Sequence, residues 1–274
     1  MSFKIISAEE RLKNQSGVKM IIVGGFGIGK TSLLKTLEEP MLCIDMEAGL
    51  LAVQDWEGST ITIRTWPEAR DCACLIGGPN PALRKDQPYS ERHYEKLKAE
   101  NDIDFEAFPV IFMDSLTVAS RLCFNWCRSE MVGKADVRMT YSLLAQEMMA
   151  WLEQFQHVPH KDVIFVGLLE PRTDEFQKQT WHLQCEGNKM ALEIPGILDE
   201  VISMIADQNG NRIFVCPTLN PLGYPAKDRS GRLDVTEPAH LGNLLKKIRE
   251  KKTTEEKELH ESKEVTKETR KNHD

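Results

Sequence analysis

The chain has 274 residues, of which 41% are hydrophobic and 28% are charged, a composition that is ordinary for a soluble globular protein with a sizeable core. No apolar run approaches the length of a membrane span, and residues 1–17 lack the hydrophobic stretch of a signal peptide, so we expect a cytoplasmic protein without membrane contact. Ten of the 35 basic and eight of the 42 acidic residues lie in residues 246–274, which leaves 25 basic against 34 acidic residues in the body. This balance excludes broad, sequence-independent adhesion to nucleic acid, so any such contact must come from local basic loops.

Hydrophobic patterning predicts strands that alternate with helices as far as residue 169. The expected strands cover residues 19–23, 41–44, 60–64, 110–113 and 162–169. The expected helices cover residues 30–37, 67–75 and 90–100, a segment that starts at residue 115, and residues 139–155. Three short strand-like runs at 180–184, 201–206 and 212–217 then predict a meander on the edge of the sheet, and residues 240–248 a final helix. This order predicts an α/β fold with a mostly parallel sheet flanked by helices, a short antiparallel meander near the C-terminus, and ligands at the C-terminal edge of the strands.

A glycine-rich segment directly follows the first expected strand and opens the first expected helix. Its sequence, GGFGIGKT, fits the phosphate-binding pattern G-x4-G-K-[S/T] (Walker A) without a mismatch. In such a loop the backbone N–H groups point at the β-phosphate, the lysine reaches the β- and γ-phosphate oxygens, and the hydroxyl residue ligates Mg²⁺. A glycine-rich turn that carries a lysine by chance is the alternative, and the flanking strand and helix disfavour it. The predicted nucleotide-binding residues are Gly24, Gly25, Phe26, Gly27, Ile28, Gly29, Lys30, Thr31 and Ser32.

An acidic residue ends the expected strand at 110–113. Asp114 follows an apolar run, and Ser115 then starts a helix. An acid at this position of a P-loop protein holds Mg²⁺ through a water molecule, beside the direct ligand Thr31. Helix capping by Asp114 and Ser115 is the alternative. The near match to the guanine-reading N-K-x-D loop, at residues 188–191, lacks the aspartate, so we expect ATP rather than GTP.

Two carboxylates, Asp45 and Glu47, follow the expected strand at 41–44. ATP hydrolysis requires a carboxylate beside the γ-phosphate that accepts a proton from the attacking water or orients it. The segment IDME resembles the ID-x-E strand end of RecA/DnaB-class P-loop ATPases, which implies a RecA-like P-loop NTPase core with Glu47 as the general base and Asp45 as a supporting acid. Capping or ion pairing at a surface loop is the alternative for both residues.

The segment AKDRSGRL at residues 226–233 resembles the K-x-R segment of the same class. The resemblance implies that Lys227 and Arg229 reach across a subunit boundary to the γ-phosphate of a neighbouring chain, although a basic surface turn is the alternative for this segment alone. An arginine that contacts the transition-state charge accelerates phosphoryl transfer about a thousandfold or more. A finger that acts in trans implies a homo-oligomer, either a closed ring or an open filament.

The four motifs, in this order on a chain with little beyond the core, resemble the phage core-only RecA-like recombinases of the Sak-four group over residues 17–235. This resemblance implies a phage nucleotide-binding protein that binds single-stranded DNA in the host cytoplasm and promotes recombination by annealing or strand pairing. RecA relatives contact DNA through two loops, whose counterparts here are residues 131–140 and 171–188. The implied DNA contacts, from positive charges and one stacking ring, are Lys134, Arg138, Arg172, Lys178 and Trp181. RecA relatives carry a polar γ-phosphate sensor at the end of the strand that precedes the second of these loops. Here that strand is apolar as far as Glu170, so either Glu170 senses the γ-phosphate or the coupling between ATP and DNA is altered.

We expect three parts along the chain: an N-terminal extension at 1–16, the ATPase core at 17–249, and a charged tail at 250–274 that is disordered or a solvated helix. The tail is a candidate contact for a single-strand binding protein or another replication partner. One alternative function is a P-loop kinase of a small molecule, whose basic lid would be formed by Arg84, Lys85, Arg92 and His93. Another is a nucleotide-binding scaffold in phage replication that recruits other proteins through the tail.

Overall fold

The computed structural model describes residues 5–7, 9–10, 17–133, 136–173, 177 and 179–250. The predicted N-terminal extension and charged tail fall largely outside these residues, so the predictions about them stay predictions. Within the described part of the chain, no helix has both the length and the apolar character that crossing a membrane requires.

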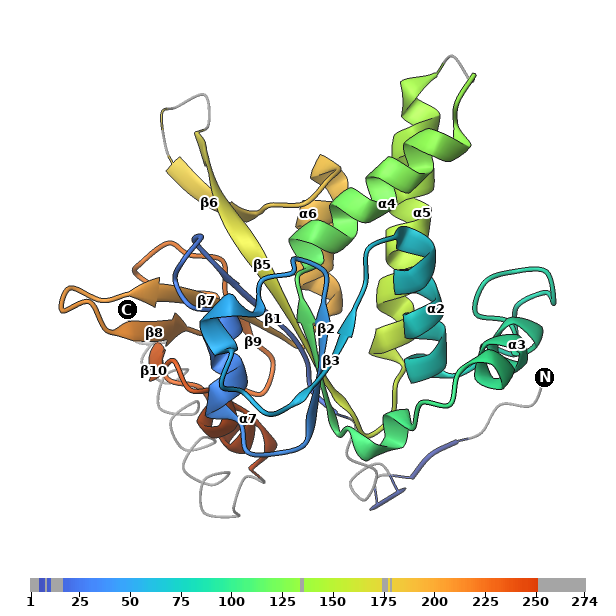
Figure 1. The fold of residues 1–274 in the computed structure, drawn as a ribbon. Coiled ribbons are helices and arrows are strands. Elements are labelled where there is room, and N and C mark those ends of the chain that lie inside the picture. The colour runs from blue at the N-terminus through green and yellow to red at the C-terminus, as the bar shows by residue number, and fades with distance from the viewer. Residues whose placement is uncertain are drawn as a thin grey trace.

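The described strands form a ten-stranded sheet in the order β10-β8-β7-β1-β5-β4-β2-β3, with β6 paired to β5 and β9 paired to β7 (Figure 1). The strands are β1 (Lys19–Gly24), β2 (Met41–Asp45), β3 (Ser59–Thr62), β4 (Val110–Asp114), β5 (Asp162–Thr173), β6 (Gln179–Leu183), β7 (Glu200–Ala206), β8 (Arg212–Val215), β9 (Lys227–Asp228) and β10 (Thr236–Pro238). The six strands from β7 to β3 in this order pair in parallel, whereas β6, β8, β9 and β10 join through antiparallel pairings. The predicted fold class is therefore confirmed.

Helices cover both faces of the sheet (Figure 1). The α-helices are α2 (Trp66–Gly77), α3 (Glu91–Glu100), α4 (Leu116–Glu130), α5 (Val137–Gln156), α6 (Asn188–Ile197) and α7 (Leu241–Arg249), and the 3₁₀ helices are η1 (Thr31–Thr36), η2 (Leu50–Val53) and η3 (Phe105–Ala107). Because successive strand residues point to opposite faces, Ile21 of β1 packs in the core with α2, α4 and α5, and Ile22 packs in the core with η1 and α7. Apolar strands buried on both sides are what a covered parallel sheet requires.

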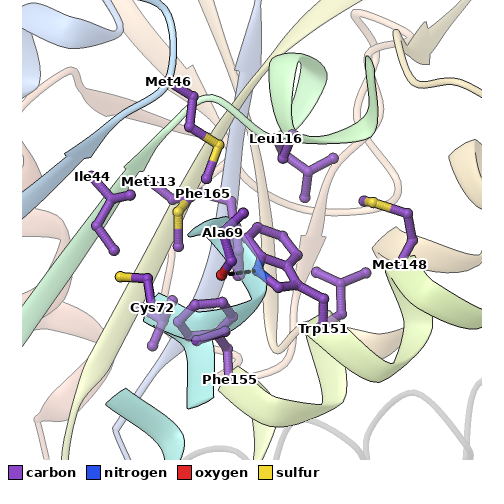
Figure 2. Close-up of a cluster of buried hydrophobic side chains, with 14 of the residues drawn as sticks. Ile44, Met46, Ala69, Cys72, Met113, Leu116, Met148, Trp151, Phe155 and Phe165 are labelled. Atoms are coloured by element: carbon purple, nitrogen blue, oxygen red, sulfur yellow. Dashed lines mark hydrogen bonds between the residues drawn. The ribbon is translucent and has the colours of Figure 1, made fainter. Parts of the chain in front are cut away.

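Trp151 of α5 lies at the centre of the larger core (Figure 2). Its ring contacts Phe155 and Phe165, with centroid separations of 5.1 and 5.7 Å. Its Nε1–H donates to the backbone oxygen of Ala69 in α2 at 3.0 Å. The one polar atom of the indole is thus paired, so the large ring is buried without an unsatisfied donor. These contacts join α2 and α5 to the sheet.

Four details of the structure differ from the predicted elements. The run at 201–206 is expected at the sheet edge, yet β7 is the inner parallel neighbour of β1 and is buried from Glu200 to Met204. The segment 171–188 is expected to form a DNA-contacting loop that includes a strand-like run at 180–184. That run is confirmed as β6, but β5 continues to Thr173 and pairs with β6 as a hairpin. The first helix is a 3₁₀ turn, and α6 was not predicted because Pro195 lies inside it and interrupts the helical pattern.

Candidate active site

The C-terminal edge of the parallel sheet carries the predicted phosphate loop. β1 ends at Gly24, and the loop runs from there to η1. A Cβ atom at Gly24 would lie 2.7 Å from the backbone oxygen of Met204 in β7, so this position has no room for a side chain. Gly29 has a φ angle of +100°, in the region that favours glycine. These two glycines allow the loop to pass close to β7 and to turn tightly into η1.

Two cations lie at this loop. The Lys30 ammonium donates to the backbone oxygens of Gly24 at 3.0 Å and Gly25 at 2.9 Å. Burial lowers the pKa of Lys30, and the carboxylates of Asp114 and Glu47 oppose that shift, so both acids lie within electrostatic range of the ammonium. Arg212 lies against the other end of the loop, since a Cβ at Gly29 would be 2.6 Å from its Nη1.

Arg212 was not among the predicted site residues. It lies on β8, far along the chain from the loop, and belongs to none of the motifs. Among the described residues, no carboxylate forms an ion pair with its guanidinium.

Thr31 and Asp114 come together as predicted for a magnesium site. The Thr31 hydroxyl donates to Asp114 Oδ2 at 2.6 Å. Asp114 is 3% exposed, and burial raises its pKa to about 6, although the Thr31 hydrogen bond and Lys30 oppose the rise. A hydroxyl and a buried carboxylate are oxygen ligands of the kind Mg²⁺ takes beside nucleotide phosphates. In the described part of the chain, no group of three or more His, Cys, Asp or Glu side chains offers a metal site, so these two oxygens fit the ion only together with phosphate or water.

Asp45 and Glu47 have different surroundings although they are two residues apart. Asp45 is buried at the end of β2, beside its register partner Asp114 on β4. Its Oδ1 accepts from the backbone N–H groups of Glu47 at 3.0 Å and Gly49 at 3.4 Å, so it holds the turn that follows the strand. Glu47 is exposed, and its Oε1 accepts a hydrogen bond from the Ser115 hydroxyl. The contact between Glu47 and Ser115 was not predicted, because sequence reasoning treated Ser115 only as a helix cap.

Lys227 and Arg229 lie at the opposite edge of the sheet from the phosphate loop. Strand β9 pairs with the start of β7, at Glu200, whereas the loop leaves β1 about four residues, or roughly 13 Å, farther along the strand direction. The Lys227 ammonium donates to three backbone oxygens at and just beyond the C-terminal end of α6, at 2.6–3.2 Å. Arg229 pairs with Asp199 at 2.8 Å, and 55% of its side chain is exposed. Within one chain, neither residue reaches the phosphate site.

Two of the predicted DNA contacts line one cleft. Its volume is about 950 Å³, and it lies between α4, α5, α6 and the β5–β6 hairpin. Arg138 and Arg172 both line it, together with two basic residues that were not predicted, Arg121 and Lys189. Glu170 also faces this cleft and accepts from Arg172 at 2.6 and 2.8 Å, so its carboxylate is paired with an arginine. Its role as a phosphate sensor stays a prediction.

The structure separates Trp181 from these arginines. Residues directly opposite on an antiparallel pair share a face, and Trp181 is opposite Pro171, whereas Arg172 is opposite Thr180. Trp181 instead stacks on Tyr224, with centroids 5.6 Å apart and planes 21° apart. One face of the ring is therefore already covered. The other two predicted contacts, Lys134 and Lys178, lie outside the described residues.

The basic segment expected as a kinase lid packs elsewhere. Helix α3 lies beyond α2, on the side of the molecule away from β1 and η1 (Figure 1). His93 at its start pairs with Asp71 of α2 at 3.1 Å, and Arg84 in the preceding loop pairs with Asp86 at 3.3 Å. This segment does not cover the phosphate loop, so the kinase alternative loses its main support.

A phosphate loop after β1 and a buried acid at the end of β4, joined by the Thr31–Asp114 hydrogen bond, define a P-loop nucleotide hydrolase. The family described as "AAA domain" matches residues 16–230, and the chain belongs to this family of ATPases. No curated protein matches the chain significantly. A solved structure described as a prototypical ATPase from the type III secretion system of pathogenic bacteria is similar at 16% identity and a TM-score of 0.40, over 71% of this chain and 53% of that one. The chain thus spans about half the length of that ATPase.

Proposed function

We propose that the protein is a Mg²⁺-dependent, phage-type ATPase that acts on single-stranded DNA as a homo-oligomer, in recombination, annealing or strand pairing. The observation that carries this proposal is the position of α4. Its N-cap residue, Ser115, contacts Glu47, and Arg121, less than two turns farther along, lines the basic cleft. The proposed hydrolytic site and the proposed DNA-binding cleft would therefore share one helix.

In this proposal the residues at the sheet edge have separate tasks. The loop N–H groups and Lys30 bind the phosphates, and Lys30 exchanges its backbone acceptors for phosphate oxygens. Thr31 and Asp114 would hold Mg²⁺, which supplies charge neutralisation at the β- and γ-phosphate oxygens. Glu47 holds Oε2 available to accept a proton from the attacking water, since Oε1 is engaged by Ser115.

The placement of Lys227 and Arg229 is compatible with the proposed homo-oligomer. Both lie at the edge of the sheet away from their own phosphate loop, so in this proposal they would contact the nucleotide of a neighbouring chain. Arg229 is half exposed and is held by a single carboxylate, that of Asp199, which a phosphate from the neighbour can replace. Repetition of this contact generates a ring or a filament.

Exposed arginines and an aromatic ring in the cleft support single-stranded DNA as its ligand. Arg121 and Arg138 are exposed within it, whereas Arg172 is paired with Glu170 and Lys189 is paired with Glu193 at 3.4 Å. Glu186 also lines the cleft. Tyr141, 45% exposed, also lines the cleft and packs on Phe124 with centroids 5.3 Å apart. We infer that Tyr141, rather than Trp181, provides the ring on which a base stacks.

Charge reversal in the cleft tests this proposal. The double variant Arg121→Glu, Arg138→Glu should weaken binding of a single-stranded oligonucleotide and reduce the salt dependence of that binding by about one unit of slope for each lost phosphate contact. Arg84→Glu is the matched control, because its side chain is 76% exposed in a loop away from the cleft.

For the unmodified protein, we expect single-stranded DNA to stimulate ATP hydrolysis and to promote assembly of the homo-oligomer. Turnover assays measure the first effect, and light scattering measures the second. A stable monomer whose ATPase rate ignores DNA would contradict the proposal. If Arg84→Glu lost as much DNA affinity as the double variant, the cleft would not be the DNA-binding site.

A further inference from the structure

Ser115 contacts Glu47 from the start of α4. Its hydroxyl oxygen accepts from the backbone N–H of Val118 at 3.3 Å, which caps the helix, and its O–H donates to Glu47 Oε1. Ser115 is 1% exposed, so its hydroxyl has little access to water. The capping bond fixes the position of the Ser115 oxygen. The hydroxyl proton is then directed at Glu47 from a serine side chain that is held in one conformation.

Without this contact the Glu47 carboxylate would have no fixed orientation. The residue is exposed beyond the end of β2, and Asp45 holds only its backbone, through the N–H group at 3.0 Å. A glutamate side chain loses considerable rotamer entropy when it is fixed, so an exposed one stays mobile unless a specific bond selects one conformation. Ser115 provides that bond to one carboxylate oxygen, and the described residues donate no hydrogen bond to the other oxygen.

We propose that Ser115 is the positioning residue for Glu47, and that its hydroxyl holds Oε1 so that Oε2 is directed at the water that attacks the γ-phosphate. The inference rests on the proposed role of Glu47 as general base. In the step itself the water proton passes to Glu47 Oε2, the water oxygen bonds to the γ-phosphorus, and the bond to the ADP leaving group breaks. Ser115 keeps its own proton throughout. A displacement of about 1 Å at a catalytic group can reduce the rate about a hundredfold.

Three substitutions separate positioning from helix capping. Ser115→Ala removes both bonds, and we expect kcat to fall about ten- to a hundredfold while KM for ATP changes little. Ser115→Gly removes the hydroxyl but is tolerated at an N-cap far better than alanine, so it should unfold close to the melting temperature of the unmodified protein and still lose kcat. Ser115→Thr keeps both bonds and should restore most of the turnover lost in Ser115→Ala.

Ser90 supplies the matched control, because it caps α3 by accepting from the His93 N–H at the same distance, 3.3 Å, and is also 1% exposed. Ser90→Ala should lower the melting temperature about as much as Ser115→Ala does, without the loss of kcat. Glu47→Gln should bind ATP and hydrolyse it far more slowly, and adding Ser115→Ala to it should cost nothing more.

Each outcome is decisive. If Glu47→Gln abolishes turnover while Ser115→Ala and Ser115→Gly both keep the kcat of Ser90→Ala, the positioning role is wrong and the proposed base stands. If Glu47→Gln retains normal turnover, the proposed base itself is wrong, and the positioning role is rejected with it. A fall in kcat that Ser115→Thr does not reverse would also reject the role of the hydroxyl.

Discussion

Replacing Glu200 by Gln perturbs a buried carboxyl that fixes the segment carrying Lys227 and Arg229. Glu200 begins β7 and is 1% exposed. It accepts from the backbone N–H groups of Arg229 at 3.3 Å and Ser230 at 3.0 Å. Burial, with the charge of Asp228 as the second cause, raises the pKa of Glu200 from 4.5 to about 8.

The sign of the effect follows from linkage. Between pH 4.5 and about 8 the folded protein holds a proton that the unfolded chain has released, so the free energy of unfolding falls as pH rises through this window. The fall is about 1.4 kcal/mol for each pH unit and at most about 5 kcal/mol over the whole window. Glutamine keeps one acceptor oxygen and carries no charge at any pH. The variant should therefore lack this decrease in the free energy of unfolding with pH.

We therefore expect the free energy of unfolding of Glu200→Gln, relative to the unmodified protein, to increase by up to about 4 kcal/mol between about pH 5 and about pH 8. Urea unfolding of both proteins across this range measures the difference, and other titrating groups cancel in the comparison. Glu100→Gln, at the exposed end of α3, is a control that removes a surface carboxylate without touching β9. Parallel stability curves for Glu200→Gln and the unmodified protein would refute the reasoning.

Two further predictions concern cations around the nucleotide. Arg229→Ala should lower turnover about a thousandfold. Activity should return in mixed assemblies with Lys30→Ala subunits, which lack the phosphate-binding lysine but keep Arg229. If no activity returned, action in trans would be contradicted. Arg212→Ala should weaken the binding of ATP and ADP about tenfold in calorimetric titrations and leave adenosine binding unchanged, because its guanidinium lies against Gly29 of the phosphate loop. Equal weakening of adenosine binding would place the contact on the base instead.

The parts of the site that local chain context determines could be predicted from sequence. The phosphate loop and Asp114 each follow an apolar run that forms a buried strand, and parallel strands end together at one edge, so Thr31 and Asp114 were expected to meet. The contact of Glu47 with Ser115 could not be derived in this way. The contact depends on the direct pairing of β2 with β4, and the hydrophobic pattern of a sequence does not determine the order of the strands in a sheet.

The DNA contacts show a different limit. The prediction assigned Arg172 and Trp181 to one DNA-contacting loop, and it did not include the pairing of the expected strand at 180–184 with the preceding strand. Once the segment forms a hairpin, the pairing of Trp181 with Pro171 puts the ring on the face opposite Arg172. Arg121 and Lys189 join the cleft from α4 and α6, and α6 itself went unpredicted.

The clustering of three acids at one sheet edge has a physical explanation in the way that each is paired. Like charges this close oppose one another, and the charges of Glu47 and Asp45 both raise the pKa of Asp114. The fold gives each acid its own neutral donor: backbone N–H groups for Asp45, the Ser115 hydroxyl for Glu47 and the Thr31 hydroxyl for Asp114. None of these three carboxylates has to share a proton with another one to form its hydrogen bonds.

A divalent cation beside Asp114 would favour its ionised form, so cation binding must weaken as pH falls through about 6. Glu47 lies farther out, exposed and held by one oxygen. In the proposed mechanism the buried acid would therefore hold the cation, and the exposed acid would accept the proton of the attacking water.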